Sequence, residues 1–366
     1  MDLQNNTNDP VLLFALKCFR LKVQFRIHLM STLASAAPDP GRIFETLNAF
    51  QQTEALKGAL DLDIFTHIAG GASSVAEIAG RAQASERGIR ILCDYLTIHG
   101  FLGKTDGRYS NSPTAEVFLN KRSPTYIGSM ATFLADPTLM ECFHDMAGSV
   151  RKGGTVSKGT LAPEDPVWVV FARAMAPFMA GTAEIVAKIV ALPGAAAQKV
   201  LDISAGHGMY GLMVAKANPA AQIYAADWAN VLEVARENAA RFGLTERFHT
   251  IPGSAFDSDL GSGYDLVLVP NFLHHFDPPT NVKFLRKLRG AMKPRATLAI
   301  VEFVPNDDRI SPPMAAAFSI QMLGGTDAGD AYTFREFSGM LSEAGFSGIQ
   351  QQPLVPTPQT LVSAQA

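Results

Sequence analysis

Charged side chains are scarce in this chain of 366 residues. Asp, Glu, Lys and Arg make up 18% of it and apolar residues 47%, whereas an average soluble protein is roughly 25% charged. This deficit predicts extra buried surface, either in an intimate homodimer or around a cavity for an apolar substrate. The formal net charge is only −3, so we expect no overall electrostatic attraction to nucleic acid.

Cysteine is scarce too, and its positions exclude two kinds of site. The three cysteines, Cys18, Cys93 and Cys142, are scattered and form no CxxC or other metal-type spacing. They cannot build a disulfide framework and are typical of a reducing compartment. We therefore expect a cytoplasmic protein without a metal site.

The N-terminal segment lacks an uninterrupted apolar run. Residues 11–30 (VLLFALKCFRLKVQFRIHLM) are apolar overall but include Lys17, Arg20, Lys22 and Arg26. Four cations within about 20 residues make a membrane span very unfavourable, and a signal peptide keeps its cations ahead of the apolar run. Two interpretations stay open: a basic amphipathic helix that touches a membrane surface or a partner, and an extension with little structure.

The chain is too long for one ordinary core, and its patterns divide it into four parts. We predict an N-terminal extension and linker over residues 1–38, a winged-helix domain over 39–112, a helical connecting region over 113–192 and an α/β domain over 193–366. Small residues and prolines mark the linker, in the stretch STLASAAPDPG.

The winged-helix prediction depends on the order helix, turn, helix and hairpin. Apolar residues at helical spacing predict a helix over 42–65, and Ser74 and Glu77 have the spacing of a capping box. A further helix follows, and then Asp106-Gly107 predicts a hairpin turn. Winged helices often bind DNA, but acidic residues dilute the arginines here. A packing or dimerisation domain is therefore favoured, and DNA binding is the alternative.

Residues 113–192 have a helical pattern and are rich in Met and Phe. Most of these side chains belong to a core, but such adaptable side chains beside a ligand-binding domain also line apolar pockets. We expect a substrate pocket lined by Phe133, Met175, Phe178, Phe272, Phe318, Met322 and Tyr332.

From residue 199 onward, apolar β-branched segments alternate with helical ones. The segments KVLDI, QIYAAD, RFHTIPG, YDLVLVPN and TLAIVEF predict strands. This alternation predicts an α/β fold with a Rossmann-like, doubly wound parallel sheet, which binds ligands at the carboxyl ends of its strands.

A glycine-rich loop joins the first strand to a helix, in KVLDISAGHGMYG. Gly206 and Gly208 let a ligand approach the backbone, and Asp227, at the end of the next strand, can accept hydrogen bonds from both ribose hydroxyls. The pattern Gly206-x-Gly208-x-x-Gly211 also matches the dinucleotide fingerprint, so a nicotinamide-dependent oxidoreductase is the main alternative. Asp202 favours a cationic sulfonium ligand, because a pyrophosphate would gain nothing from a negative charge there.

Together these motifs resemble those of class I methyltransferases that use S-adenosylmethionine (SAM), of the type that includes plant caffeic-acid and bacterial polyketide O-methyltransferases. The resemblance covers about residues 40–355 and depends on VLDISAGHG, Asp227, GSAF (253–256), FLHHF (272–276), VEF (301–303) and TFREFSGMLSEAGF (333–346). It implies a homodimer whose SAM-binding catalytic domain, over 193–366, methylates a small-molecule acceptor. The resemblance implies neither a nucleic-acid partner nor a membrane span.

The resemblance also implies a set of cofactor-binding residues. They are Asp202, Ser204, Gly206, Gly208, Asp227, Trp228, Ser254, Ala255, Phe256 and Asn271. Ser204 stands where the first glycine of the family loop is usual, and Ser254 replaces the acid that receives the adenine amino group. Adenine binding is then expected to depend on the Ser254 hydroxyl, backbone groups and packing against Trp228 and Phe256.

The family's LHDW pattern aligns with LHHF in this chain and matches its general base to His274. Glu302, 28 residues later, stands where the family has a glutamate that orients the base and stabilises imidazolium. The alternatives are a structural His274 and a Glu302 that pairs with Arg309. His275 takes the place of an acid and is expected to be structural, and the run HHFD has no spacing that favours a metal.

The family's third acid falls in GDAYT, where Ala331 takes the place of the acid and Tyr332 that of an arginine. Weaker support for the base suits an acceptor that ionises easily, such as an acidic phenol, or one that needs little proton removal. We therefore predict a SAM-dependent O-methyltransferase for a small aromatic or other apolar hydroxylated metabolite. Carbon or nitrogen methylation is the alternative within the same fold, and a ligand-sensing winged-helix protein is the alternative outside enzymes.

Overall fold

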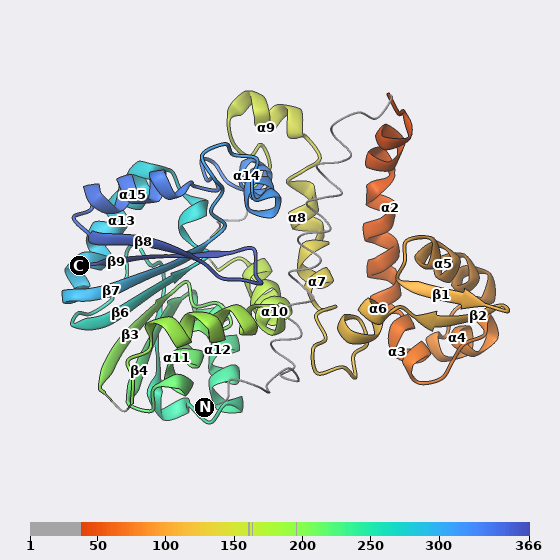
Figure 1. Cartoon of the computed structure of the whole chain (residues 1–366), viewed down its shortest axis with the longest axis horizontal. Helices are drawn as coiled ribbons and strands as arrows, with labels where there is room; N and C mark the ends of the chain where they lie inside the picture. The colour runs from red at the N-terminus through yellow and green to blue at the C-terminus, as the bar shows by residue number, and fades with distance from the viewer. Residues whose placement is uncertain (1–37, 160–161, 163, 195) are drawn as a thin grey trace, which may run out of the picture.

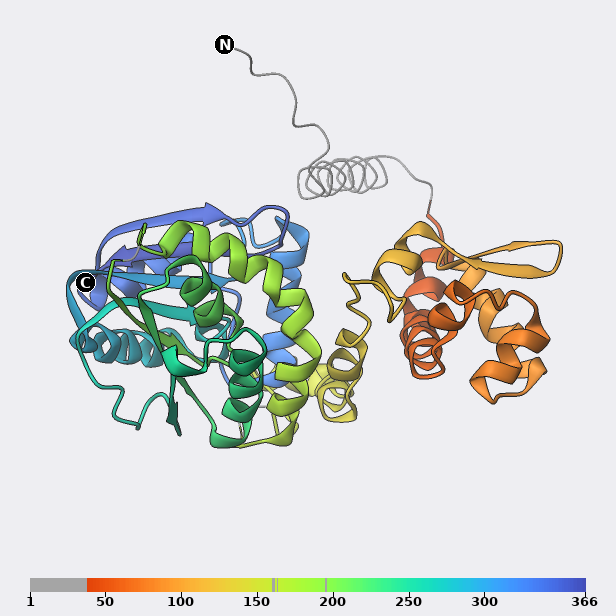
Figure 2. The same ribbon diagram turned by 90° about the horizontal axis from the view of Figure 1, so that it is seen from below.

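The computed structural model describes residues 38–159, 162, 164–194 and 196–366 (Figure 1). The segment 11–30, with its two interpretations, lies outside the described residues. The described chain forms a small N-terminal lobe and a larger α/β lobe, with short helices between them (Figure 2).

The N-terminal lobe has the predicted order of helix, turn, helix and hairpin. Its elements are α2 (Gly41–Asp61), α3 (Ile64–Ala69), α4 (Val75–Ala82), α5 (Glu86–Ile98), β1 (Leu102–Thr105), β2 (Arg108–Asn111) and α6 (Pro113–Phe118). The single helix expected over 42–65 is wrong, because Asp63 takes a left-handed φ of 53° and separates α2 from α3. The predicted capping box is present: the Ser74 N–H donates to the Glu77 carboxylate over 2.9 Å, and the Glu77 N–H donates to the Ser74 hydroxyl.

The hairpin turn of this lobe follows from its two residues. Asp106 and Gly107 have φ values of 50° and 76°, the left-handed conformation that tight two-residue hairpin turns need. The lobe also builds its own core around Phe65, Ile78 and Cys93.

The connecting helices are α7 (Met130–Leu134), α8 (Pro137–Glu141), α9 (Met146–Lys152) and α10 (Pro166–Val190). By length and composition, α10 is the one helix among the described residues that is apolar enough to cross a membrane. Its small and apolar side chains, such as Ala172, Ala183 and Val186, are buried, and the helix packs against α7, α11 and α12. This packing is that of a core helix.

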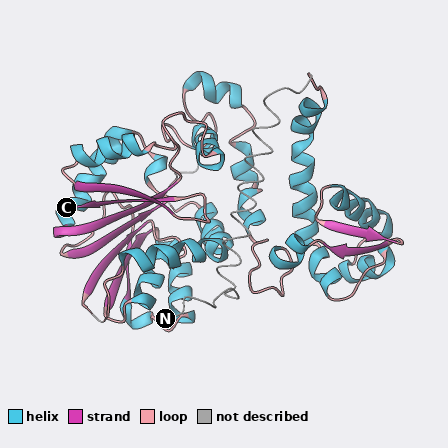
Figure 3. Ribbon diagram, viewed as in Figure 1, coloured by secondary structure: helices cyan, strands magenta, loops and turns pink. Residues whose placement is uncertain are grey.

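The α/β lobe is built on a seven-stranded sheet in the order β5-β4-β3-β6-β7-β9-β8 (Figure 3). Its strands are β3 (Gln198–Ile203), β4 (Ala221–Asp227), β5 (Phe248–Pro252), β6 (Tyr264–Pro270), β7 (Met292–Glu302), β8 (Ser347–Pro353) and β9 (Thr360–Gln365). Strands β3 to β7 pair in parallel, and β9 pairs antiparallel with β7 and β8.

Helices cover both faces of this sheet. They are α11 (Met209–Ala217), α12 (Ala229–Arg241), α13 (Pro278–Ala291) and α15 (Phe334–Glu343), whereas α14 (Pro313–Gly325) packs against α9. The 3-10 turns are η1 (Thr245–Arg247) and η2 (Leu273–His275). One core lies between the sheet and α10, α11 and α12, and the other lies between the sheet and α13 and α15. The predicted Rossmann-like α/β fold is therefore confirmed.

Candidate active site

The carboxyl ends of neighbouring parallel strands meet at one edge of the sheet, and polar residues gather there. Asp202 lies in β3, Asp227 ends β4, Asn271 follows β6 and Glu302 ends β7. Because β3 lies between β4 and β6, and β6 lies beside β7, these four residues form a continuous row. The Tyr210 hydroxyl forms a hydrogen bond with the Asn271 side chain. Burial raises the pKa of this hydroxyl, and the charges of Asp202 and Glu302 raise it further.

The glycine-rich loop after β3 owes its shape to three left-handed residues. Ser204, Gly206 and Gly208 have φ values of 50°, 56° and 75°, and Gly208 caps the N-terminus of α11. Glycine takes this conformation without strain, whereas a side chain makes it less favourable. Ser204 thus keeps the backbone shape at the position where the family usually has glycine.

Asp227 ties the glycine loop to the next strand. Its carboxylate accepts hydrogen bonds of 2.7 Å from the Gly206 N–H and the Trp228 N–H. Burial nevertheless raises the pKa of Asp227 to about 6. Each oxygen keeps a free lone pair, so the carboxylate can still accept hydrogen bonds from ribose hydroxyls.

Asp202 is buried and only half satisfied by the protein. One oxygen accepts a 2.9 Å hydrogen bond from the Gly211 N–H, and the other has no partner among the described residues. Burial raises the pKa of Asp202 to about 8, and the charge of Asp227 adds to this effect. An orphaned carboxyl oxygen next to a helix N-terminus suits a ligand with a positively charged donor group.

His207 is a residue of the loop that the sequence analysis missed. Its Nδ1 accepts a 3.1 Å hydrogen bond from the Met209 N–H, and its ring stacks between Phe171 and Tyr210 with centroid distances of 6.2 and 6.3 Å. Burial lowers the pKa of His207 to about 4, which keeps Nδ1 free to accept. In the sequence, only the position of His207 between Gly206 and Gly208 indicates that it belongs to this loop.

The residues expected around adenine lie on the loops after β4 and β5. Trp228 packs against α10 through Ala172, and the Ser254 hydroxyl accepts a 3.2 Å hydrogen bond from the Phe256 N–H. The sequence analysis missed Lys287 of α13, whose ammonium donates to the carbonyls of Ala255 and Phe256 over 3.0 and 2.7 Å. No local motif announces this contact, because it joins residues far apart in the chain.

His274 and Glu302 meet directly. His274 Nδ1 lies 2.6 Å from one Glu302 carboxylate oxygen, and both side chains are buried. The other carboxylate oxygen accepts backbone N–H bonds from Phe272 and His274 over 3.0 and 3.3 Å. The carboxylate can only accept, so Nδ1 carries the hydrogen and Nε2 carries the lone pair whenever the imidazole is neutral.

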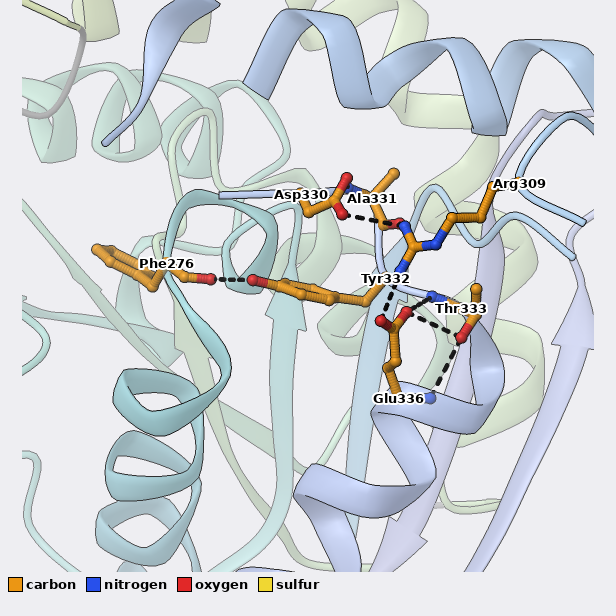
Figure 4. Close-up of polar contacts among 7 residues, drawn as sticks. All are labelled: Phe276, Arg309, Asp330, Ala331, Tyr332, Thr333 and Glu336. Atoms are coloured by element: carbon orange, nitrogen blue, oxygen red, sulfur yellow. Dashed lines mark hydrogen bonds and ion pairs between the residues drawn. The ribbon is translucent and has the colours of Figure 1, made fainter. Parts of the chain in front are cut away.

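Arg309 does not pair with Glu302, which was the alternative role for that glutamate. It binds instead Asp330 over 3.0 Å and Glu336 over 2.5 Å, and it donates to the Ala331 carbonyl (Figure 4). The same view shows the Tyr332 hydroxyl, which donates to the Phe276 carbonyl over 2.5 Å.

The segment 326–333 packs against the backbone of the turn that contains His274 and His275. A Cβ at Gly329 would lie 2.2 Å from the His274 carbonyl oxygen, so the two backbones touch. Ala331 is fully buried and brings no carboxylate to the site.

The residues expected to line a substrate pocket fall into separate groups. Phe133, Met175 and Phe178 belong to one apolar cluster between α7, α8 and α10, which also contains Trp168 and Phe171. The sequence analysis missed these last two residues, although they share the helical spacing of α10.

A second group lies nearer to the histidines. The rings of Phe318 of α14 and His274 meet edge to face with centroids 4.8 Å apart, and Met322 is buried one turn further along α14. Phe272 packs in an aromatic group with Phe256. Tyr332 lies in the core under α15, with its hydroxyl occupied as described above.

The described residues include no group of three His, Cys, Asp or Glu side chains that could hold a metal ion. The orphaned oxygen of Asp202, the left-handed loop and the Asp227 carboxylate instead fit an adenosine ligand with a cationic group.

The comparisons with known proteins identify the family. Residues 160–347 match the O-methyltransferase domain, and residues 44–121 match the O-methyltransferase dimerisation domain. The 3-hydroxy-5-methyl-1-naphthoate 3-O-methyltransferase of Streptomyces sahachiroi is 28% identical over 324 residues, which cover 85% of this chain and 90% of that relative.

Two solved structures share the fold. A crystal structure from Nostoc punctiforme, assigned to the O-methyltransferases, has a TM-score of 0.87 and 47% identity, and the match covers 90% of this chain and all of that one. Human N-acetylserotonin methyltransferase in complex with SAM has a TM-score of 0.77 and 21% identity, covering 91% of this chain and 99% of that one.

The fold and the glycine-loop site define a class I methyltransferase that uses SAM. The family match is narrower, and the chain belongs to the O-methyltransferase family. The predicted SAM-dependent O-methyltransferase is therefore confirmed over the nicotinamide-dependent oxidoreductase.

Proposed function

We propose that this enzyme methylates a hydroxyl of a small aromatic or other apolar metabolite, with His274 as the general base and Glu302 as the residue that orients it. The observation that carries the proposal is the 2.6 Å contact between His274 Nδ1 and the Glu302 carboxylate. A carboxylate that holds Nδ1–H leaves the Nε2 lone pair for the acceptor hydroxyl and stabilises the imidazolium that forms.

When bound, SAM supplies a methyl group already activated by its sulfonium. The residues that would hold it are the glycine loop from Ser204 to Gly208, the carboxyls of Asp202 and Asp227, and the packing surfaces of Trp228, Ala255 and Phe256. Ser254 and Asn271 complete this proposed set. The orphaned oxygen of Asp202 supports the placement of a cationic amino group.

The acceptor is proposed to be aromatic because the side chains near His274 are aromatic. Phe318 meets the His274 ring edge to face, and Phe133 and Trp168 belong to the apolar cluster of α10. Phe178, Met175 and Met322 would complete the apolar wall. The relative from Streptomyces sahachiroi is named for a hydroxynaphthoate, which agrees with an aromatic hydroxyl as the methylated group.

We further propose that the enzyme works as a homodimer in the cytoplasm, without nucleic acid or a membrane span. The dimerisation domain supports self-association, and Cys93 and Cys142 are free, buried thiols. Several basic side chains of the N-terminal lobe pair with acids: Arg90 and Lys104 both contact Asp94, and Arg108 contacts Glu77. This pairing leaves little unbalanced charge for a phosphate backbone.

Replacing the base tests the proposal. His274→Ala should lower turnover of a weakly acidic phenol such as 2-naphthol by roughly 10²–10⁴-fold, because general-base catalysis contributes on that scale. SAM affinity, measured by calorimetry, should stay unchanged. Glu302→Gln should cause a smaller loss, because the base remains but its tautomer is less well fixed.

The acidity of the acceptor gives a second readout of the same reaction. An acceptor that is already ionised, such as a nitronaphthol above its pKa, needs no base, so the His274→Ala defect should shrink on it. Full turnover of 2-naphthol by His274→Ala would show that proton removal is not the task of this residue.

A further inference from the structure

His275 lies next to the proposed base and has one committed ring nitrogen. Its Nδ1 is 3.1 Å from the Phe272 carbonyl oxygen. A carbonyl only accepts, so Nδ1 carries the hydrogen, and Nε2 of the neutral ring carries a lone pair. Burial and the neighbouring His274 hold the pKa of His275 well below its usual value, so this neutral tautomer persists at physiological pH.

The second ring nitrogen is unused within the described part of the chain. Nε2 has no hydrogen-bond partner there, and it is absent from the buried side-chain nitrogen and oxygen atoms that lack a partner, so it is accessible. The side chain as a whole is only partly buried. An accessible lone pair on a neutral ring can accept a hydrogen bond from a bound molecule.

The surroundings of the ring show where that donor would come from. The His275 ring centroid lies 4.2 Å from that of His274 and 5.6 Å from that of Trp168, whose ring it meets edge to face. Trp168 packs on the apolar cluster that contains Phe133 and Met175. His275 therefore lies between the proposed base and the apolar wall proposed for the acceptor.

We propose that His275 is a specificity-determining residue, whose Nε2 accepts a hydrogen bond from a second donor group beside the methylated hydroxyl. The proposal builds on the function proposed above and adds a class of acceptor: an aromatic ring with two neighbouring hydroxyls. Two imidazoles with centroids 4.2 Å apart suit neighbouring groups on one ring. His274 takes the proton of the hydroxyl that receives the methyl group, and His275 holds the hydroxyl that does not.

A purely structural role for His275 would explain the hydrogen bond of Nδ1. It would give no function to Nε2, which has no partner among the described residues. The two roles are separable because different substitutions keep different nitrogens. His275→Asn keeps an amide donor for the Phe272 carbonyl and loses the Nε2 acceptor. His275→Gln places an amide oxygen near the position of Nε2 and loses the Nδ1 donor.

The test compares a diol with a mono-ol. Wild type and both variants are given 2,3-dihydroxynaphthalene and 2-naphthol with saturating SAM, and kcat/KM is measured for each by mass spectrometry of the methyl ethers. After correction for its two equivalent hydroxyls, wild type should prefer the diol about tenfold, the scale of one well-placed hydrogen bond to a substrate hydroxyl. His275→Gln should keep most of this preference. His275→Asn should lose it and retain its rate on 2-naphthol.

Two outcomes would overturn the proposal: a wild-type enzyme without preference for the diol, and a His275→Asn variant with the full preference. Both differ from failure of the proposed function, which concerns methyl transfer to 2-naphthol itself and its dependence on His274. SAM affinity of each variant, measured by calorimetry, reports that the fold of the cofactor site is intact.

Discussion

Two buried carboxyls of the cofactor site differ in how well the protein satisfies them. Asp227 accepts two backbone N–H bonds, whereas Asp202 accepts one and leaves an oxygen without a partner in the described structure. Burial raises their pKa values to about 6 and about 8. At pH 7 the free protein therefore keeps Asp202 mostly protonated, and a cationic ligand group would favour its ionised form.

This difference predicts that SAM binding at pH 7 releases up to about one proton, since ionisation of Asp202 accompanies binding. Calorimetry in buffers of different ionisation enthalpy, such as phosphate and Tris, measures the number released. Asp202→Asn is the control and should release close to none. Equal enthalpies in all buffers for the wild-type protein would contradict the assignment of Asp202 to the cofactor's cationic group.

The same pKa shifts set the sign of a stability effect without ligand. Because both folded pKa values are raised above the unfolded value near 4, the native protein holds these protons more tightly than the unfolded chain does. The contribution of the two groups to stability is full below about pH 4 and is lost as the pH rises through about 6 and about 8.

At the scale of elements, the loop between α14 and α15 packs against the histidine turn η2 and holds it in position. The Tyr332 hydroxyl bonds the Phe276 carbonyl, and Arg309 fixes the loop through Asp330 and Glu336. The family has its third acid in this segment, whereas this chain has the buried Ala331. In this loop, the Tyr332 hydroxyl and backbone contacts, rather than a carboxylate, support the turn that carries the proposed base.

Tyr332→Phe should therefore lower kcat about fivefold while leaving SAM affinity unchanged, because one hydrogen bond of roughly 1 kcal/mol restrains the histidine turn. Tyr264→Phe is the matched control: its buried hydroxyl also donates to a backbone carbonyl, that of Leu260, over 2.5 Å. Tyr264 begins β6, at the end of the strand away from the histidines. Both variants should lose similar stability in thermal melts. An equal loss of kcat in both would mean that Tyr332 acts through stability alone.

The parts of these elements that the sequence predicted are those with local signals. The capping box of α4, the hairpin turn at Asp106-Gly107 and the alternation of strands and helices each depend on residues a few positions apart. The pairing of His274 with Glu302 was predicted only through the family resemblance, since His274 lies in η2 after β6 and Glu302 ends the neighbouring strand β7.

The contacts that the sequence did not predict join distant segments or depend on backbone shape. Lys287 binds carbonyls of the loop after β5, and Trp168 meets His275 from another helix. Asp63 interrupts a continuous helical pattern by one left-handed residue. Periodicity carries no information about such contacts, because tertiary packing determines them.

At the scale of the whole molecule, the N-terminal half of α2 carries a cluster of exposed apolar side chains. Ile43, Phe44, Leu47 and Phe50 are 63%, 65%, 68% and 59% exposed. These four residues lie within two turns of the same helix. Figure 1 shows this helix on the side of the N-terminal lobe that faces the rest of the chain. Clustered exposed apolar side chains on a folded protein mark an interaction surface, and the dimerisation domain includes Phe44, Leu47 and Phe50.

We expect this face of α2 to be buried in the homodimer, so Leu47→Glu should dissociate it. In a symmetric dimer each substitution occurs twice, so burying two charges in place of two leucines should raise the dimer dissociation constant by at least about 100-fold. Ile189→Glu, at a similarly apolar residue that is 41% exposed on α10, is the matched control and should remain dimeric. Sedimentation velocity across micromolar concentrations measures both. SAM affinity of the Leu47→Glu protein should stay close to that of wild type, because the glycine loop and its two aspartates lie within one α/β lobe. A Leu47→Glu protein that sediments as the wild-type dimer would place the dimer contact elsewhere on the chain.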